Sequence, residues 1–254
     1  MIPMKSPGDI KRMRQSGRIA ADVLMALEDR VRPGVTTAEM DRTAHDLIVK
    51  AGGDPSFLGY GGFPASICAS LNEQVVHGIP SDDCVLRDGD IISVDVGVLY
   101  KGFHGDNART YAVGTVAPET TELLKVTREC LSLGLAEVRA GAQLGAMSHA
   151  VQAHAEEHGF GVVRQFAGHG IGERLHEEPH VPNYGKPNDG PELRAGMALA
   201  IEPMINAGTH RVRTLDDGWT VVTADGRPSA HFEHTVVVLS DGVEILTNWD
   251  AATT

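Results

Sequence analysis

The sequence predicts the α/β (α+β) fold class, built from two halves that are related by a pseudo-twofold axis. The first observation is an internal repeat: residues 31–34 (VRPG) recur at 138–141 (VRAG), and residues 86–89 (LRDG) recur at 193–196 (LRAG), each 107 positions further on. A constant offset over two separate blocks is hard to produce by chance. The second observation is that each half has helical periodicity followed by strand alternation. Two repeats are too few for an extended array, so a closed pair of half-domains is the simplest packing.

Helical periodicity predicts two helices in each half. Apolar residues recur at three- and four-residue spacing over residues 20–27, 40–51, 124–135 and 144–155. Either Thr36 or Thr37 can act as the N-cap of the second of these helices, because a threonine hydroxyl accepts a hydrogen bond from a free backbone N–H at a helix start. The two pairs of helices therefore correspond across the repeat.

Strict alternation predicts one strand in each half, and each of these strands carries an acid. Over residues 91–98 the aliphatic side chains share one face, and Asp95 shares the other face with a serine and a glycine. Over residues 198–205 the same division places Glu202 beside alanines. Because the repeat maps Asp95 onto Glu202, both acids should occupy equivalent positions, with small neighbours that leave room above them.

Two further strands complete the pattern, and each is entered through an acid. Residues 108–113 follow Asp106, and residues 232–239 begin beside Glu233. Each half therefore supplies two acids at matching strands. A cleft between the halves would receive carboxylates from both sides.

Asp95 and Asp106 are separated by a segment that contains a natural turn at residues 100–102 (YKG). If the turn is centred between Tyr100 and Lys101, the two aspartates lie directly opposite one another, with Cβ atoms about 5 Å apart. Like charges at that distance repel. The pair then requires a shared proton, a basic neighbour or a bridging cation.

Four acids without a matching cluster of Lys or Arg favour a metal site over an exposed pair of acids on a hairpin. His169 lies in the segment GHGIG at 168–172, where glycines should let the backbone come close to a ligand. Four carboxylates and one imidazole suit two first-row divalent ions that share bridging carboxylates, such as manganese, iron, cobalt or zinc. A water between two such ions becomes hydroxide near neutral pH. The residues therefore predict a two-metal hydrolase.

The remaining histidines divide into two groups. His77 and His176 lie in segments with glycine and proline that read as loops at the cleft edge, where we expect contact with a substrate. On predicted helix faces, and therefore expected to be solvated, are His45, His149, His154 and His158. His231 and His234 belong to an HFEH string that resembles a zinc motif, but on a strand they would point to opposite faces.

Composition and charge limit the function classes. The formal net charge of −12 argues against DNA or other broad nucleic-acid binding, because phosphate contacts need clustered Lys and Arg. One local exception is a basic group near the N-terminus, which consists of Lys11, Arg12, Arg14 and Arg18. A solvated helix face explains that group better than a docking patch. Three widely spaced cysteines argue against a disulfide framework, and we expect Cys84 and Cys130 to be buried free thiols.

We expect the 254 residues to form a single catalytic domain, with repeats near 10–113 and 117–239. The second half carries about twenty additional residues between 206 and 229, including Trp219, which should form a hairpin or a loop that lines the cleft. The start of the chain lacks the apolar stretch of a signal peptide, and no run approaches the roughly 20 apolar residues of a membrane span. We therefore expect a cytoplasmic protein with no membrane contact.

With these residues in place, the chain resembles type I methionine aminopeptidases over essentially its whole length. The matching motifs are NE at 72–73 with HGIP at 77–80, Asp95 with GFHGD at 102–106, GHGIG at 168–172 with HEEP at 176–179, IEPM at 201–204, DGWT at 217–220 and EHT at 233–235. The resemblance implies the pita-bread fold, with a central antiparallel sheet, helices on the outer face and a dinuclear metal site at the pseudo-twofold axis. It also implies removal of the initiator methionine from nascent polypeptides whose second residue is small.

The resemblance assigns a role to each residue that matches a family motif. The implied ligands of two divalent ions (cobalt, manganese, iron(II) or zinc) are Asp95, Asp106, His169, Glu202 and Glu233, with Asp106 and Glu233 bridging. The implied catalytic residues are Glu202, His77 and His176. The methionine pocket is lined by Tyr60, Phe63, Cys68, His77 and Trp219, an environment that suits an unbranched thioether. Transient ribosome contact would follow from nascent chains as substrates, and the lack of a strongly apolar amphipathic surface favours a monomer.

Four positions depart from the usual family pattern. Phe57 stands where the family has cysteine, Gly97 where it has threonine, Leu175 where it has an aromatic residue and His231 where it has glutamine. These departures leave the ligand set intact and alter the expected pocket shape. One alternative is a prolidase or Xaa-Pro aminopeptidase, which shares the fold but usually has an additional N-terminal domain and lacks the DGWT element at 217–220. The other is a metal-free binding protein on the same scaffold, against which the complete ligand set argues.

Overall fold

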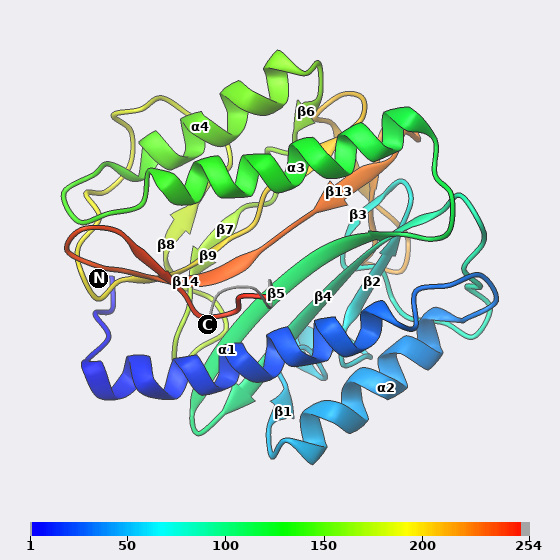
Figure 1. The fold of residues 1–254 in the computed structure, drawn as a ribbon, viewed down its shortest axis with the longest axis horizontal. Coiled ribbons are helices and arrows are strands. Elements are labelled where there is room, and N and C mark those ends of the chain that lie inside the picture. The colour runs from blue at the N-terminus through cyan, green and yellow to red at the C-terminus, as the bar shows by residue number, and fades with distance from the viewer. Residues whose placement is uncertain (1, 250–254) are drawn as a thin grey trace.

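The computed structural model describes residues 2–249 and has two pairs of helices on either side of antiparallel strands (Figure 1). In this view α1 (Pro7–Glu28) and α2 (Thr37–Lys50) lie along one side, and α3 (Pro118–Ala136) and α4 (Leu144–Glu157) lie along the other. The predicted α/β (α+β) class and both pairs of helices are confirmed. Among residues 2–249, no helix is both long and apolar enough to span a bilayer.

Local sequence explains where the helices of the first half begin. Ser6 caps α1 and Thr36 caps α2, and each forms a reciprocal capping box with the acid three residues later, Asp9 or Glu39. The Thr36 hydroxyl accepts from the Glu39 backbone N–H at 3.1 Å, and the Glu39 carboxylate accepts from the Thr36 N–H at 2.8 Å. Of the two threonines considered as the cap of α2, Thr36 is therefore the one that fills this position.

A long hairpin forms the centre of the first half. Strand β4 (Ile91–Tyr100) pairs with β5 (Phe103–Ala112), and β1 (Asp54–Pro55) and β2 (Cys68–Leu71) pair with β4. Lys101 and Gly102 form the turn, with φ angles of 50° and 79°. Two positive φ angles in a two-residue loop are typical of a type I′ turn, whose twist matches that of the flanking strands.

The two aspartates do not lie directly opposite one another as expected, because the turn lies one residue further along the chain. Because the turn is centred between Lys101 and Gly102, Asp106 lies opposite Gly97, and Asp95 lies opposite Ala108. The aspartates are therefore diagonal neighbours, two residues out of direct opposition. They still share one face of the hairpin, since a shift of two residues preserves the alternation.

The second half has a five-stranded sheet in the order β15 (Val243–Ile245), β14 (His234–Val238), β9 (Ala198–Ile201), β7 (Gly168–Gly170) and β8 (Glu177–Val181). The prediction of one continuous strand at 198–205 is wrong. The segment forms two strands, β9 and β10 (Met204–Asn206), separated by Glu202 and Pro203. Proline has no N–H to donate to a ladder. The break lets β9 and β10 belong to different sheets.

The strand expected at 232–239 is found as β14, which begins at His234, two residues later than expected, after a break that follows β13 (Ser229–His231). Here the backbone leaves the ladder to contact the other half, because the N–H of Glu233 donates to the carbonyl of Ala108 at 2.9 Å. Each break in the second half thus places an acid, Glu202 or Glu233, outside regular strand pairing.

Two smaller sheets complete the architecture. One contains β13, β10 and β6 (Gly161–Val162), and the other contains β11 (Val212–Thr214), β12 (Val221–Thr223) and β3 (Gln74–Val76). The additional residues of the second half therefore form the β11–β12 hairpin, with Trp219 in its connecting loop. Because β12 pairs with β3 of the first half, this hairpin spans both halves.

Equivalent local contacts recur in the two halves at the offset found in the sequence. The N–H of Gly34 donates to the carbonyl of Leu86 at 2.9 Å, and the N–H of Gly141 donates to the carbonyl of Leu193 at 2.8 Å. Isolated bridges join Thr36 to Val85 and Gln143 to Glu192, which are again 107 positions apart. One buried apolar cluster includes a residue from every helix: Ala20, Met40, Leu123 and Met147.

Two threonines join the halves along β5. Thr235 of β14 accepts from the backbone N–H of Asp106 at 2.9 Å and donates its hydroxyl to the Asp106 carbonyl at 2.8 Å. Thr110 of β5 makes the corresponding pair of contacts, both 2.8 Å long, with the backbone of His231. These buried contacts fix β5 beside β13 and β14, which brings the acids of the two halves together.

Candidate metal centre

The structure brings all five predicted metal ligands together where the halves meet. They are Asp95 of β4, Asp106 of β5, His169 of β7, Glu202 after β9 and Glu233 before β14. One ligand atom from each of Asp106, His169 and Glu233 lies within 4.8 Å of the other two. The Nε2 atom of His169 lies 3.6 Å from a carboxylate oxygen of Glu202, and Asp95 shares a side-chain hydrogen bond with Asp106.

Four carboxyl groups at this depth cannot all be ionised without compensation. Burial raises the pKa of all four, those of Asp95, Asp106, Glu202 and Glu233, and repulsion between the acids adds to the effect at Asp95, Asp106 and Glu233. Within residues 2–249, one buried oxygen of Asp95 (Oδ1) and one of Glu233 (Oε1) have no hydrogen-bond partner. No Lys or Arg is found among the described residues that line the cavity beside them. Divalent cations would supply both the missing positive charge and the missing partners, so this donor set fits metal ions.

His169 is held in the tautomer that a metal ligand needs. Its Nδ1 lies 2.9 Å from the carbonyl oxygen of Gly170, an acceptor, so Nδ1 carries the proton and Nε2 keeps its lone pair. Nε2 lies between Glu202 and Asp106, 3.9 Å from the latter. Burial lowers the pKa of His169 to about 3, which keeps the imidazole neutral.

The glycines beside His169 have a different role from the one expected. A Cβ atom on Gly168 would collide with the backbone oxygen of Ala200, and one on Gly170 would collide with the backbone oxygen of Glu178. These glycines therefore let β7 pack closely between β9 and β8. The effect is to hold His169 rigidly in the sheet.

A cavity of about 190 Å³ opens beside these ligands. Its lining includes every residue assigned to substrate binding: Tyr60, Phe63, Cys68, His77, His176 and Trp219. Phe63 meets Trp219 edge to face with ring centroids 5.2 Å apart, and His77 meets Trp219 at 6.2 Å. His77 has a φ of 60°, a left-handed backbone conformation that is costly for a residue with a side chain. The surrounding packing thus fixes the His77 ring at the cavity wall.

Comparison with known proteins places this site in a family. Residues 11–240 match the family model of metallopeptidase family M24. This chain belongs to metallopeptidase family M24. The five gathered ligands are those that the resemblance to a family with this fold implied, and the predicted recognition is confirmed.

Relatives and solved structures extend over nearly the whole M24 chain. The methionine aminopeptidase of Clostridium acetobutylicum is 52% identical over 247 residues, which cover 97% of this chain and 99% of the relative. A crystal structure of methionine aminopeptidase from Thermotoga maritima matches with a TM-score of 0.96 and 44% identity, covering 98% and 100% of the two chains. Prolidase from Pyrococcus furiosus matches with a TM-score of 0.77 and 22% identity, covering 96% of this chain and 65% of the other. The prolidase shows a shared fold alone, and together the matches confirm the pita-bread architecture.

Several residues of the M24 cavity were not identified from the sequence. They are Val76, Phe166, Ala167 and Met204, which join the atypical residues Phe57 and Leu175 in the lining. Two of them could have been identified from their positions in the sequence, because Phe166 lies three residues before His169 and Met204 lies two residues after Glu202. Phe166 meets the His77 ring edge to face at 5.6 Å, so it shapes the same wall.

His231 is closer to the metal centre than the sequence indicated. Its Nε2 lies 3.4 Å from a carboxylate oxygen of Glu202, and the residue is buried. His234 points elsewhere and stacks on Trp249 with ring centroids 3.8 Å apart, so the expected divergence of the two histidines holds. The overlooked signal is the spacing of His231 and Glu233, because residues two apart in an extended segment share a face.

Two smaller expectations need correction. His45 and His154 are half-buried and hydrogen-bonded, to Ser66 at 2.9 Å and to Glu129 at 2.8 Å, whereas His149 and His158 are exposed as expected. Their helices pack against other elements, which covers part of each polar face. Of the free thiols Cys68 and Cys130 are buried, but Cys84 is half-buried because it lies in the loop between β3 and β4.

Proposed function

We propose that this M24 chain is a methionine aminopeptidase that removes the N-terminal methionine of nascent polypeptides when the second residue is small. The observation that carries the proposal is the position of the cavity, whose wall of aromatic rings and one thiol stands directly beside a neutral imidazole and four acids, of which Asp106 and Glu233 are buried and Asp95 and Glu202 half-buried. An unbranched thioether adapts well to such a wall and gains contacts between sulfur and aromatic rings. The names of the relatives at about half identity support the same activity.

The site would hold two divalent ions through Asp95, Asp106, His169, Glu202 and Glu233, with Asp106 and Glu233 as the bridging ligands. Divalent ions bound there lower the pKa of a coordinated water toward neutrality and polarise a carbonyl group. An oxygen-rich set with one nitrogen suits cobalt, manganese, iron(II) or zinc, and metal supply in the cell decides among them.

The side chains around the metal centre have separate tasks in this proposal. Glu202 accepts a proton from the attacking water and passes it to the departing amide nitrogen, a task that suits a carboxyl group whose pKa burial has raised. His176 donates from its ring to the scissile carbonyl oxygen and stabilises the charge that develops there. His77 lies beside the second residue of the substrate, and its pKa of about 4 keeps it neutral.

Peptide hydrolysis tests the proposal directly. The protein should release methionine from Met-Ala-Ser and leave Leu-Ala-Ser intact. A chelator should abolish the reaction, and titration with cobalt, manganese, iron(II) or zinc should restore it. Preferred cleavage of an Xaa-Pro dipeptide would instead assign the chain to the prolidase class. Binding of peptide without hydrolysis under any of these metals would indicate a binding protein and overturn the proposal.

A substitution of one bridging ligand tests the metal centre itself. Glu233→Gln preserves size but removes a charge, so we expect hydrolysis to fall below detection while the circular dichroism spectrum stays that of the parent. Glu178→Gln, on the exposed side of β8, is the control and should keep full activity. Full activity in Glu233→Gln would rule out the bridging assignment.

This function implies nascent chains as partners in the cytoplasm, and we expect a monomer from the lack of a strongly apolar amphipathic surface in the sequence. Contact with the ribosome would be transient and would follow from the substrate alone. The basic group on α1 offers little free charge for docking, because Arg12 pairs with Asp9 at 2.6 Å, Arg18 pairs with Asp22 at 2.9 Å and Arg14 pairs with Glu244.

A further inference from the structure

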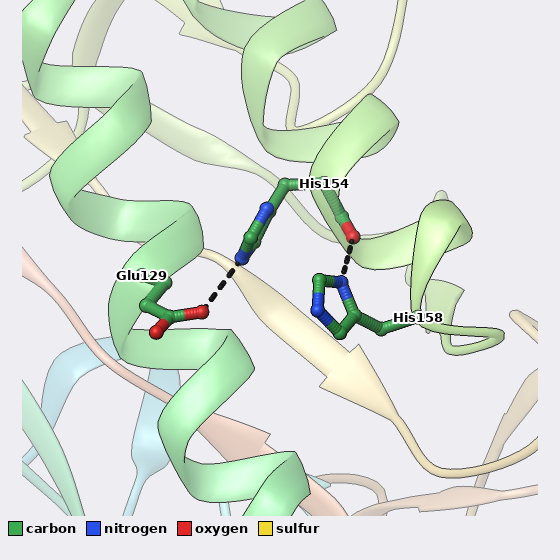
Figure 2. A group of neighbouring side chains, drawn as sticks. All are labelled: Glu129, His154 and His158. Carbon is green, nitrogen blue, oxygen red and sulfur yellow. Dashed lines mark hydrogen bonds and ion pairs between the residues drawn. The ribbon is translucent and has the colours of Figure 1, made fainter.

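A second cluster of potential metal ligands lies on the outer helical layer, away from the cavity and its acids. It consists of Glu129 on α3 and of His154 and His158 at the C-terminal end of α4. Figure 2 shows the three side chains converging in the space between the two helices. None of the three lines the catalytic cavity, so the cluster has no part in the proposed hydrolysis.

The distances within the cluster are short. Nε2 of His154 lies 2.8 Å from a carboxylate oxygen of Glu129, and Nδ1 of His158 lies 2.9 Å from the backbone carbonyl oxygen of His154 (Figure 2). The two imidazole rings have centroids 4.6 Å apart. One donor atom from each of the three side chains lies within 4.8 Å of the other two.

The hydrogen bonds leave Nε2 of His158 free for a cation and join the other two side chains to each other. Because a carbonyl oxygen can only accept, Nδ1 of His158 carries the proton and Nε2 keeps its lone pair, as in His169 of the catalytic centre. The hydrogen bond from His154 holds the pKa of Glu129 below its ordinary value, so the carboxylate is ionised. Lys125 lies 4.0 Å from the other carboxylate oxygen of Glu129. The oxygen that faces His154 accepts the hydrogen bond from Nε2 of His154, so an ion bound between these two atoms takes the place of that proton, and neutral His154 then carries its proton on Nδ1.

The four-residue spacing of His154 and His158, the C-cap residue of α4, places both imidazoles at the same end of this helix. Residues four apart on an α-helix lie on the same face, one turn from each other, and this is the spacing by which two imidazoles on one helix bind a single ion. In tetrahedral zinc sites with bonds of about 2.0–2.1 Å, neighbouring donor atoms are about 3.3 Å apart. Since His158 is exposed, its ring can turn toward an ion without displacing packed groups.

We propose that Glu129, His154 and His158 form a separate binding site for a divalent transition ion that prefers imidazole, with zinc as the reference ion and solvent in the remaining position. Two imidazoles and one carboxylate are a donor set of this kind, whereas the catalytic centre offers four carboxylates and one imidazole. The bound ion joins α3 to α4 at a point where Figure 2 shows the helices side by side. It therefore stabilises the folded chain in proportion to its occupancy.

Counting bound ions tests this site without reference to hydrolysis. The untagged full-length protein is dialysed against zinc, and the ions per chain are measured by elemental analysis. We expect His158→Gln to bind one ion fewer per chain than the parent. The matched control is His149→Gln, an exposed histidine on the same helix that is outside the cluster, and it should bind as many ions as the parent.

Two further measurements separate the new site from the catalytic one. Glu129→Gln should also bind one ion fewer, and both cluster variants should release methionine from Met-Ala-Ser at the parent rate. Zinc should raise the midpoint of thermal unfolding less in His158→Gln than in the parent. Equal ion counts in parent and His158→Gln, or an equal loss in His149→Gln, would overturn the proposal. Failure of the parent to cleave Met-Ala-Ser would count against the proposed function and leave this site intact.

Discussion

The hydroxyl oxygen of Tyr60 lies 2.6 Å from Nδ1 of His176 at the mouth of the cavity. In the tautomer that carries its proton on Nε2, His176 accepts this hydrogen bond at Nδ1 from the Tyr60 hydroxyl. Partial desolvation lowers the pKa of His176 below 6.5, which favours the neutral form. In that tautomer His176 is a hydrogen-bond donor whose ring lies 4.3 Å, centroid to centroid, from that of His169.

Removing the Tyr60 hydroxyl should slow hydrolysis. Tyr60→Phe keeps the ring in the cavity wall but releases His176 to adopt either tautomer. The loss of one hydrogen bond of about 0.5–1.5 kcal/mol corresponds to a fall in kcat of roughly two- to thirteenfold, with a smaller change in KM. Steady-state kinetics on Met-Ala-Ser measure both. Tyr100→Phe, in the first half beside the β4–β5 turn, is the control, and an unchanged kcat in Tyr60→Phe would show that the contact does not orient His176.

A buried ion pair supports the segment that carries His176. Nζ of Lys5 lies 2.6 Å from a carboxylate oxygen of Glu177, and both side chains are almost inaccessible to solvent. Lys5→Met would leave the carboxylate buried without its partner, a change that costs about 3–5 kcal/mol. We expect a large decrease in the free energy of unfolding in urea. The double variant Lys5→Met, Glu177→Gln should recover part of it, because the charge is removed along with its partner; a double variant less stable than Lys5→Met would contradict this account.

His77 should make stability depend on pH in a defined range. Burial, with smaller contributions from His231 and His176, lowers the pKa of His77 to about 4, whereas an unfolded histidine titrates near 6.5. The unfolded chain therefore takes up the proton first as the pH falls. The contribution of neutral His77 is complete above pH 6.5 and is lost between pH 6.5 and 4, at up to about 1.4 kcal/mol per pH unit.

Urea unfolding of the chelated protein between pH 7.5 and 5 measures this slope. His77→Gln should flatten it by nearly one proton, since glutamine does not titrate. His149→Gln removes an exposed histidine and should leave the slope as in the parent. Identical slopes in the parent and His77→Gln would mean that His77 does not account for the pH dependence.

The sequence was a good guide where structure follows from local pattern. The helices follow apolar spacing, and the capping box at Thr36 and Glu39 is local in sequence. The repeat brought an acid of each half to the same site, although Asp95 lies inside β4 and Glu202 lies after the end of β9. The family motifs supplied the predicted ligand set, whose side chains the fold brings together.

The errors arise where one half meets the other. Regular strand pairing stops at Glu202 because Pro203 has no N–H to continue it. It stops at Glu233 because the backbone N–H of Glu233 donates to the carbonyl of Ala108 in the first half. The contact of His231 with Glu202 also joins segments that have no pattern in common. The position of the β4–β5 turn is a different case, because it depends on the positive φ of Lys101. A lysine in the sequence gives no signal of that conformation.

Gly97 and Phe57, two of the positions that depart from the usual family pattern, are neighbours beside the metal centre. Gly97 lies opposite Asp106, and a Cβ atom on Gly97 would come within 2.6 Å of the Phe57 ring and 2.8 Å of Cβ of Ser56. The resemblance to the family implies threonine and cysteine at positions 97 and 57. The large ring of Phe57 therefore fills the volume that a threonine side chain would take, and the two departures compensate one another.

This compensation predicts strong coupling between the two positions. Gly97→Thr alone overpacks the site, which costs about 1–3 kcal/mol, and it displaces Phe57 within the cavity wall. Phe57→Cys alone leaves a void and costs about 3 kcal/mol or more, because the ring is buried. In the double variant the threonine occupies the space that the ring vacates. Its loss of stability in urea unfolding should therefore be smaller than the sum of the single losses by about 1–3 kcal/mol. Additive losses, equal within about 0.5 kcal/mol, would show that the two side chains do not share this space.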